Sequence, residues 1–267
     1  MTYTDTDHTF VVCAYKESPF LEECLQSLLA QTVPSRILIA TSTPNDLITE
    51  LSRKYDLPVF VNTGVHGIGG DWNFALSQAS TRFVTIAHQD DLYFPAYTET
   101  ILARLSKAKE PLICFSRYAE LRGSGKTFST VTKNKLLRIK NLLLWPLSFF
   151  PRSRFVRRRV LSLGCPICCP AVTYDRETIL AHPFETDLAS NLDWQEWEKL
   201  SKLKGSFLYC KQVLMAHRIH TGSTTSAIIG ENKRTNEDLV MFKKFWPAPI
   251  AKVIAKVYAS GEKSNQV

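Results

Sequence analysis

Two neighbouring carboxylates follow directly on an apolar segment of the chain. The stretch RFVTIAHQDD, residues 82–91, is mostly apolar and then ends in His88, Gln89, Asp90 and Asp91. The apolar run predicts a buried strand, and like charges side by side at its end repel each other and are costly to desolvate. Carboxylate oxygens suit Mg²⁺ or Mn²⁺, which bind through one or two carboxylates and the phosphates of a substrate. The pair therefore indicates a metal site for a phosphorylated ligand, with a solvated acidic loop as the alternative.

A further carboxylate, Asp193, begins a predicted helix over residues 193–204. At the start of a helix the dipole favours the ionised form of a carboxylate. An ionised carboxylate in a suitable position can take the proton of an attacking hydroxyl group. An ordinary helix cap is the alternative for this residue. His66 and His217 have no comparable context and are expected to be loop or core residues.

The elements that must position these groups alternate along the first 120 residues. Helical patterns lie at residues 18–29, 71–79 and 96–107. Several strand-like runs are apolar at consecutive positions, as in strands that helices cover on both faces. These runs are Thr9–Ala14, Arg36–Ala40, Val59–Asn62, Arg82–Ala87 and Leu112–Ser116. The alternation predicts an α/β fold with a doubly wound sheet.

The predicted sheet brings polar residues to one edge, because ligands of doubly wound sheets bind beyond the carboxyl ends of the strands. Polar clusters at residues 15–17, 41–46 and 88–91 fall at such ends. After residue 164 the pattern continues with a strand that ends at Tyr174, one or two strands within 207–220, and helices near 232–245 and 249–258.

The net charge of +8 comes from one segment. No Asp or Glu lies between Leu121 and Tyr174, whereas 11 Lys and Arg residues lie there. Within residues 133–159, Leu136, Ile139, Leu143 and Leu147 share a predicted helical face, and aromatic residues and an arginine run follow. This mixture favours a helix at the surface of an anionic membrane. A solvated insertion over the active site is the alternative; nucleic-acid binding is disfavoured because no recognisable module accompanies the charge.

The composition also bounds the location of the chain. The N-terminus lacks an export signal, and no apolar run approaches the roughly 20 residues that span a bilayer. Seven irregularly spaced cysteines argue against a disulfide framework and for a reducing cytoplasm.

Taken in order, the motifs resemble those of family 2 glycosyltransferases with the GT-A fold. The similarity covers roughly residues 8–225. It is carried by TFVVCAYKESPFLEECLQSLLAQT, GVHGIGGDWNFAL, VTIAHQDDLY, GCPICCPAVTY, LDWQEWEKLSKLKGSFLY and HRIHTGSTT, of which the last three fit bacterial members. The resemblance implies a Rossmann-like, mostly parallel sheet with a helical, basic insertion and C-terminal helices.

The resemblance also implies a division of the chain and a role for individual residues. Residues 1–120 would bind the nucleotide sugar, 121–163 would form the basic amphipathic insertion, 164–230 would be the acceptor and catalytic half of the same domain, and 231–267 a helical tail. Asp193 matches the catalytic base, Asp90 the metal ligand, and His220 a late residue near the metal. The residues matched to nucleotide binding are Ala14, Tyr15, Glu17, Thr41, Asp71, Asn73, His88 and Asp91.

Three positions depart from the family pattern. His88 stands where the metal motif has its first aspartate, so the ribose contact would be made differently. Ala40 and Thr41 replace an acidic residue that reads the base, which leaves uridine, thymidine and guanosine donors open. Trp72 stands in the place of an arginine, which removes one expected phosphate contact.

The resemblance implies a metal-dependent, inverting transfer of a sugar from a nucleotide donor to a hydroxyl of a glycan or lipid-linked acceptor, with Mn²⁺ or Mg²⁺ as the cofactor. The expected setting is surface-polysaccharide assembly, with the protein cytoplasmic and peripheral at the inner face of the membrane. A nucleotidyltransferase is a rival, but the glycine-rich, arginine-bearing loop of those enzymes is absent after the first predicted strand. A non-catalytic binding protein that uses its basic face is the other rival, which the presence of Asp90, Asp91 and Asp193 disfavours.

Overall fold

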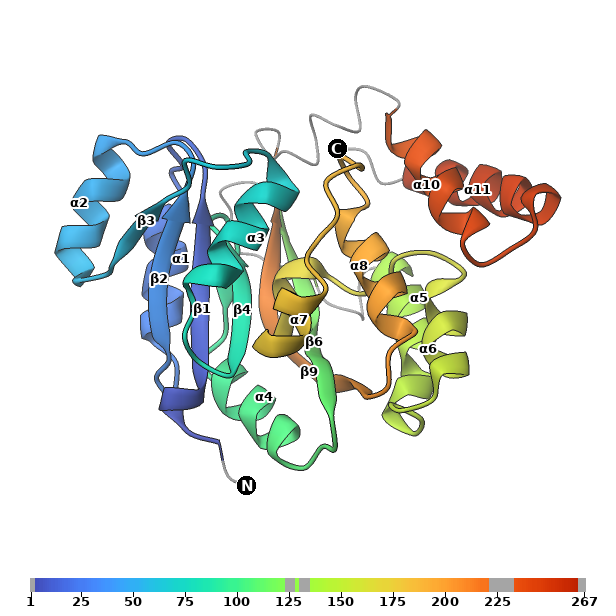
Figure 1. The fold of residues 1–267 in the computed structure, drawn as a ribbon, viewed down its shortest axis with the longest axis horizontal. Coiled ribbons are helices and arrows are strands. Elements are labelled where there is room, and N and C mark those ends of the chain that lie inside the picture. Colours follow the sequence, from blue (N-terminus) through green and yellow to red (C-terminus); the bar gives the residue numbers. More distant parts are fainter. Residues whose placement is uncertain (1–2, 123–127, 130–134, 221–232, 264–267) are drawn as a thin grey trace.

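The computed structural model describes residues 3–122, 128–129, 135–220 and 233–263, and these form a mixed sheet with helices packed around it (Figure 1). The sheet has nine strands in the order β3-β2-β1-β4-β8-β6-β9-β5, with β7 paired to β6. The strands are β1 His8–Ala14, β2 Arg36–Thr41, β3 Val59–Val61, β4 Phe83–His88, β5 Leu92–Tyr93, β6 Pro111–Arg122, β7 Phe128–Ser129, β8 Val172–Asp175 and β9 Ser206–Ile219.

The N-terminal half is the predicted parallel part of the sheet. Strand β1 pairs in parallel with both β2 and β4, so Val11 lies between Leu38 and Ile86. These strands are buried along nearly their whole length, which explains their continuous apolar sequences. The helices of this half are α1 Leu21–Leu29, α2 Asp46–Tyr55, α3 Ile68–Gln78 and α4 Tyr97–Ser106. The helix predicted from residue 18 begins at Leu21, and Oγ of Ser18 accepts a hydrogen bond from the N–H of Phe20 (3.3 Å).

The second half joins the first through antiparallel pairing. Strand β8 runs antiparallel to both β4 and β6, so β6 and its parallel neighbour β9 point in the same direction as β4. Residues 207–220, for which the sequence predicted one or two strands, belong to the single strand β9 up to Ile219. Its carboxyl end, at His217–Ile219, therefore reaches the same sheet edge as the carboxyl end of β4.

The remaining helices pack against this second half. Residues from all parts of the chain share one core cluster, among them Val11, Leu144, Trp194 and Met241. These helices are α5 Lys135–Leu144, α6 Arg154–Leu161, α7 Arg176–Ala181, α8 Leu192–Ser201, α10 Lys233–Lys243 and α11 Ala248–Lys263, and short 3-10 turns lie at Asp5–Asp7, Trp145–Ser148 and Cys169–Ala171.

Helix α5 differs from the face that its sequence predicts. Its buried residues are Leu137, Asn141 and Leu144, whereas Ile139 is 57% exposed. The helix ends at Leu144, and the following 3-10 turn contains Pro146. Because a 3-10 turn winds more tightly than an α-helix, the helical spacing does not continue to Leu147, which is fully buried.

Candidate active site at the carboxyl edge of the sheet

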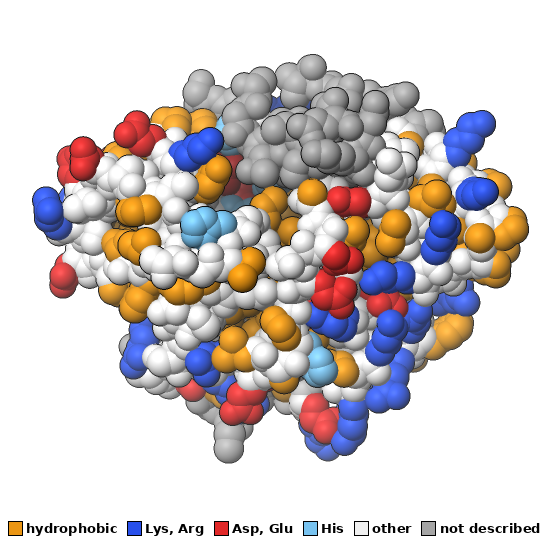
Figure 2. Space-filling view, turned by 45° about the horizontal axis from the view of Figure 1, so that its top comes forward, with side chains coloured by type: hydrophobic (Ala, Val, Ile, Leu, Met, Phe, Trp, Pro, Cys, Tyr) orange, Lys and Arg blue, Asp and Glu red, His pale blue; other side chains and the backbone are white. Residues whose placement is uncertain are grey.

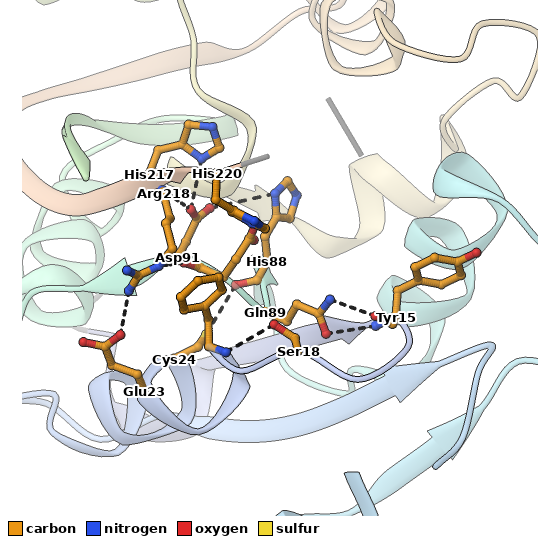
Figure 3. Close-up of polar contacts among 12 residues, drawn as sticks. Tyr15, Ser18, Glu23, Cys24, His88, Gln89, Asp91, His217, Arg218 and His220 are labelled. Atoms are coloured by element: carbon orange, nitrogen blue, oxygen red, sulfur yellow. Dashed lines mark hydrogen bonds and ion pairs between the residues drawn. The ribbon is translucent and has the colours of Figure 1, made fainter. Parts of the chain in front are cut away.

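Three potential metal ligands gather just beyond β4. One ligand atom each of His88, Asp90 and Asp91 lies within 4.8 Å of the others. Asp91 is fully buried, and its Oδ1 accepts hydrogen bonds from the backbone N–H of Arg218 (2.8 Å) and from Nδ1 of His217 (3.0 Å) (Figure 3). Its Oδ2 lies 3.9 Å from Nδ1 of His88 and has no hydrogen-bond partner in the described part of the chain. The group combines hard oxygen ligands with an imidazole nitrogen.

Asp90 is paired with the histidine that follows β9. Its Oδ2 lies 2.9 Å from Nε2 of His220. Burial acts to raise the pKa of Asp90, but the charge of His88, the hydrogen bond with His220 and the charge of His217 outweigh it, so the pKa lies below its usual value. Asp90 is therefore an anion at neutral pH.

His217 and Arg218 complete this group, although His217 was expected to be a loop or core residue and Arg218 was not predicted to be a site residue. Burial acts to lower the pKa of His217, but Asp91 outweighs it and raises the pKa to about 9. Arg218 is 2% exposed, donates from Nη2 to Glu23 (2.6 Å) and from Nε to the carbonyl of Asp90 (2.9 Å), and lies 4.3 Å from the ring centroid of Phe20. The side chain thus ties α1, β4 and β9 together. The available signal was the sequence HRIH, which directly follows the apolar run VLMA.

The loop after β1 is attached to the end of β4 through Gln89. The Gln89 amide accepts from the backbone N–H of Tyr15 (3.0 Å) and donates to its carbonyl (2.9 Å). The N–H of Lys16, whose φ of 56° is left-handed, donates to Oγ1 of Thr43 (2.6 Å). The ring of Tyr15 stays 48% exposed at this edge, and Glu17 is also exposed. Of the other residues matched to nucleotide binding, Ala14 and Thr41 end their strands and are buried.

Helix α3 contributes a carboxylate and an aromatic ring. Asp71 accepts hydrogen bonds from Oγ of Ser42 (3.0 Å) and Nδ2 of Asn62 (2.8 Å). Trp72 stacks on His88, with the ring centroids 5.5 Å apart and the planes 20° apart. Trp72 and His88, two of the positions that depart from the family pattern, therefore pack directly on each other.

Asn73 joins the two halves of the molecule. Its amide donates to the carbonyl of Phe184 and accepts from the N–H of the same residue, both at 2.9 Å. These bonds hold α3 against the segment between α7 and α8.

Asp193 lies in the first turn of α8 and is partly buried. Its Oδ1 accepts from the N–H of Trp194 (2.7 Å), and the thiol of Cys165 lies 3.8 Å from Oδ2. Burial raises the pKa of the Cys168 thiol, and the charges of both Asp91 and Asp193 raise it further. The carboxylates of Asp91 and Asp193 therefore both lie within electrostatic range of one thiol, that of Cys168.

The segment before Asp193 is held by a carboxylate of α10. Glu237 accepts hydrogen bonds from the backbone N–H groups of residues 189, 190 and 191, at 2.7–3.0 Å, and from Oγ of Ser190 (2.6 Å). Burial acts to raise the pKa of Glu237, but these hydrogen bonds outweigh it and lower the pKa.

We expect the replacement Glu237→Gln to lower the free energy of unfolding by about 1–3 kcal/mol at pH 7, because it removes a charged acceptor of several hydrogen bonds. A lowered pKa in the folded state stabilises the protein above the ordinary carboxyl pKa, and this stabilisation is lost as the pH falls through the lowered value. The difference between the two proteins in urea unfolding should therefore shrink in acid. A difference that is constant with pH would contradict this role of the charge.

A hollow of about 240 Å³ lies between the start of α3 and the start of α8. It is lined by residues 66–70 on one side and by Thr186, Leu188, Ala189 and Leu192 on the other. The glycines are required by close packing: a Cβ on Gly70 would lie 2.3 Å from the carbonyl oxygen of Val65, and one on Gly69 would lie 3.1 Å from that of Glu185. The glycine-rich segment thus forms one wall of a hollow whose other wall leads into Asp193.

The sequence model of Glycosyl transferase family 2 matches residues 9–169. The chain belongs to this family. An uncharacterized glycosyltransferase of Rickettsia bellii is 24% identical over 239 residues, which cover 85% of this chain and 32% of that protein. The chain thus spans about a third of the length of this relative.

Solved structures with the same fold include three enzymes. The mannosyltransferase PcManGT from Pyrobaculum calidifontis, in complex with GDP-Man and Mn²⁺, has a TM-score of 0.63 and 17% identity over 96% of this chain and 70% of its own. TarS residues 1–349 of S. aureus, in complex with UDP-GlcNAc, has a TM-score of 0.62 and 17% identity, with coverages of 93% and 70%. Glucosyl-3-phosphoglycerate synthase from Mycobacterium tuberculosis, in complex with Mn²⁺, UDP and glucosyl-3-phosphoglycerate, has a TM-score of 0.59 and 14% identity, with coverages of 89% and 79%. These likenesses show that this family 2 chain has the GT-A fold.

Proposed function

We propose that this protein transfers a sugar from a nucleotide-sugar donor to a hydroxyl group of a glycan or lipid-linked acceptor. The observation that carries the proposal is the group formed by His88, Asp90 and Asp91 beyond β4, with Asp193 close enough for its charge and that of Asp91 to act on the same thiol. The complexes of PcManGT with GDP-Man and of TarS with UDP-GlcNAc support a nucleotide-sugar donor for this fold.

The donor atoms of the group suit Mn²⁺ or Mg²⁺. Asp90 is anionic, and Asp91 holds a buried Oδ2 without a hydrogen-bond partner among the described residues. We propose Asp90 as the principal ligand, with His220 beside it and Asp91 orienting the group. A divalent ion bound there would neutralise charge that develops on the diphosphate leaving group.

The chain's own residues divide the remaining work. Asp193 would accept the proton of the attacking hydroxyl, and a direct displacement of this kind inverts the sugar carbon. Tyr15 and Glu17 would contact base and ribose, as would Ala14 and Thr41 through their strand ends. Asp71 and His88 would lie near the diphosphate. Asn73 would act indirectly, because its amide holds Phe184. The hollow between α3 and α8 would receive the sugar.

A panel of UDP-, GDP- and dTDP-sugars, each incubated with the protein and Mn²⁺, tests this function. We expect one donor class to release its nucleoside diphosphate, and an added acceptor fraction to accelerate the release. Release of pyrophosphate would indicate a nucleotidyltransferase. If no donor is turned over but the protein still binds anionic vesicles, the result would indicate the non-catalytic binding protein.

For membrane association we propose a basic apolar face, which consists of α5, residues 145–163 and α11. Of sixteen large hydrophobic side chains exposed in the described ranges, seven lie between Ile139 and Leu163 and four in α10 and α11. Residues 121–163 and 240–258 contain no Asp or Glu. Figure 2 shows Lys and Arg side chains among hydrophobic ones on the right, the side on which α5, α6 and α11 lie in Figure 1.

The cations of this face differ from those that the sequence suggests. Arg157 is fully buried, donates to the carbonyl of Leu203 (2.7 Å) and lies 5.0 Å from the ring centroid of Phe207. Arg158 pairs with Glu198 at 2.6 Å. The exposed cations are Lys135, Arg138, Arg152, Arg154, Arg159, Lys252 and Lys256. Residues 133 and 134 of the predicted surface lie outside the described residues.

We expect the double replacement Arg138→Gln/Arg159→Gln to weaken binding to phosphatidylserine vesicles about 30-fold at low salt, since each surface cation contributes about 1 kcal/mol. The matched control is Arg53→Gln/Lys54→Gln on α2, which lies at the opposite end of the molecule in Figure 1 and should bind like the wild type. Co-sedimentation measures both. An equal loss of vesicle binding in the two variants would show that binding responds to net charge alone. That result would contradict the proposed role of this face in membrane binding.

Within the described ranges, no helix has the length and apolarity that a membrane crossing requires. We propose a peripheral position at the inner face of the cytoplasmic membrane. The odd number and irregular spacing of the seven cysteines favour a reducing compartment for this proposal.

A further inference from the structure

Lys140 of α5 turns away from the exposed side of its own helix. Its neighbours Ile139 and Leu142 are 57% and 72% exposed, whereas Lys140 reaches inward and donates from Nζ to the hydroxyl of Tyr118 (2.9 Å). Tyr118 is 7% exposed and lies in β6. Among the described residues, no carboxylate lies within ion-pair distance of this ammonium group. Lys140 is thus a largely enclosed cation whose hydrogen-bond acceptor is neutral.

The position of Lys140 connects it to the candidate active site. The rings of Tyr118 and His217 are 6.4 Å apart, and His217 in turn contacts Asp91 at 3.0 Å. The charges of Lys140, Asp91 and Asp193 all act on the thiol of Cys168, and the charge of Lys140 also acts on His217. Lys140 is therefore connected to the group beyond β4 through Tyr118 and His217.

An enclosed ammonium group without a carboxylate is costly unless an anion compensates its charge. An ammonium group has three N–H donors, and the described residues engage one of them through Tyr118. The remaining donors suit the oxygens of a phosphate group, which a lysine binds as a point charge. The donor's diphosphate is expected at His88 and Asp90, to which Lys140 is linked, within the described part of the chain, only through Tyr118, His217 and Asp91. The anion that reaches Lys140 would then belong to the acceptor.

We propose that Lys140 binds a phosphate group of the acceptor and that this acceptor is a lipid-linked phosphate. The inference rests on the proposed transferase function. The lipid source follows from α5 itself, because the helix that carries Lys140 toward the site also carries Ile139 and Leu142 toward the proposed membrane surface. A lipid phosphate that passes from this surface to the inner side of α5 would meet Lys140 there, while its chain extends back toward the bilayer.

Vesicle binding tests the proposal without activity. Vesicles of phosphatidylcholine and phosphatidylserine are compared with vesicles of equal surface charge in which part of the phosphatidylserine is replaced by a polyprenyl phosphate. We expect the wild type to bind the second kind about tenfold more tightly, as one charged hydrogen-bonded contact allows. Lys140→Gln should lose this preference and Lys140→Arg should keep most of it. Tyr118→Phe, which removes the neutral acceptor but leaves the charge, should also keep it.

Two further measurements distinguish a lipid phosphate from a free phosphate, and the acceptor site from the donor site. Soluble phenyl phosphate should abolish the preference only at millimolar concentration if the lipid chain contributes; full competition at micromolar concentration would overturn a lipid source. Binding of nucleoside diphosphate with Mn²⁺, measured by calorimetry, should be the same in Lys140→Gln and the wild type. A selective loss of nucleotide binding would move Lys140 to the donor site, and an unchanged vesicle preference in Lys140→Gln would also overturn the proposal. Failure of the wild type to bind any nucleotide would refute the proposed function instead.

Discussion

Replacing Asp90 with asparagine should abolish Mn²⁺-dependent nucleotide binding and lower the rate of sugar transfer at least a hundredfold. The substitution keeps the size of the side chain and removes the charge that would hold a divalent ion, which is worth several kcal/mol in the transition state. The fold should survive, because Asp90 contributes its backbone carbonyl, and not its side chain, to the contact with Arg218. Calorimetric titration of nucleoside diphosphates with and without Mn²⁺ measures the effect.

The matched control for this variant is Asp46→Asn. Asp46 is an exposed aspartate that follows β2 at the same edge of the sheet, and it begins α2. It should leave nucleotide binding unchanged. Metal-dependent binding that persists in Asp90→Asn would refute the assignment of Asp90, and an equal loss in Asp46→Asn would show only a general effect of negative charge at this edge.

The replacement Asp193→Asn should lower kcat by about 10²–10⁴-fold and leave the Kd of the donor unchanged, because a general base acts on the acceptor hydroxyl and not on the bound nucleotide. The amide keeps the acceptor oxygen that bonds the N–H of Trp194, so α8 should still begin at the same position. Steady-state kinetics with the donor identified in the screen, together with calorimetry, separates the two effects.

Glu196, one turn later in α8, is the rival base. Burial raises its pKa to about 7, although the charge of Lys199, 2.6 Å away, opposes this. Glu196 is 1% exposed, so an acceptor has little access to it. Glu196→Gln should therefore keep most of the activity, whereas inactivity of Glu196→Gln alongside an active Asp193→Asn would exchange their roles.

The parts of the fold that the sequence predicts well are those set by local pattern. Continuous apolar runs mark β1, β2 and β4, and the carboxylates that follow β4 lie at the carboxyl edge of the sheet. The end of a strand fixes the position of the residues that follow it directly. The positions of His88 and Asp90 could therefore be predicted without knowing which distant segments contact them.

What escaped prediction depends on contacts between segments far apart in the sequence. His217 and Arg218 join the site only because β9 inserts between β6 and β5, which no local pattern encodes. In the arginine run of α6, Arg157 points into the core, and a hydropathy pattern does not tell a buried arginine from an exposed one. Similarly, the end of α5 at Leu144 changes which leucines face the protein.

The most direct measurement of the central claim is a crystal structure of the protein with Mn²⁺ and the nucleoside diphosphate that it binds, recorded at a wavelength at which Mn²⁺ scatters anomalously. The account predicts an anomalous peak at coordination distance from the carboxylate of Asp90, with the diphosphate beside it and the base near Tyr15. A peak elsewhere, or a nucleotide bound without the ion and away from the carboxyl edge of β4, would contradict it.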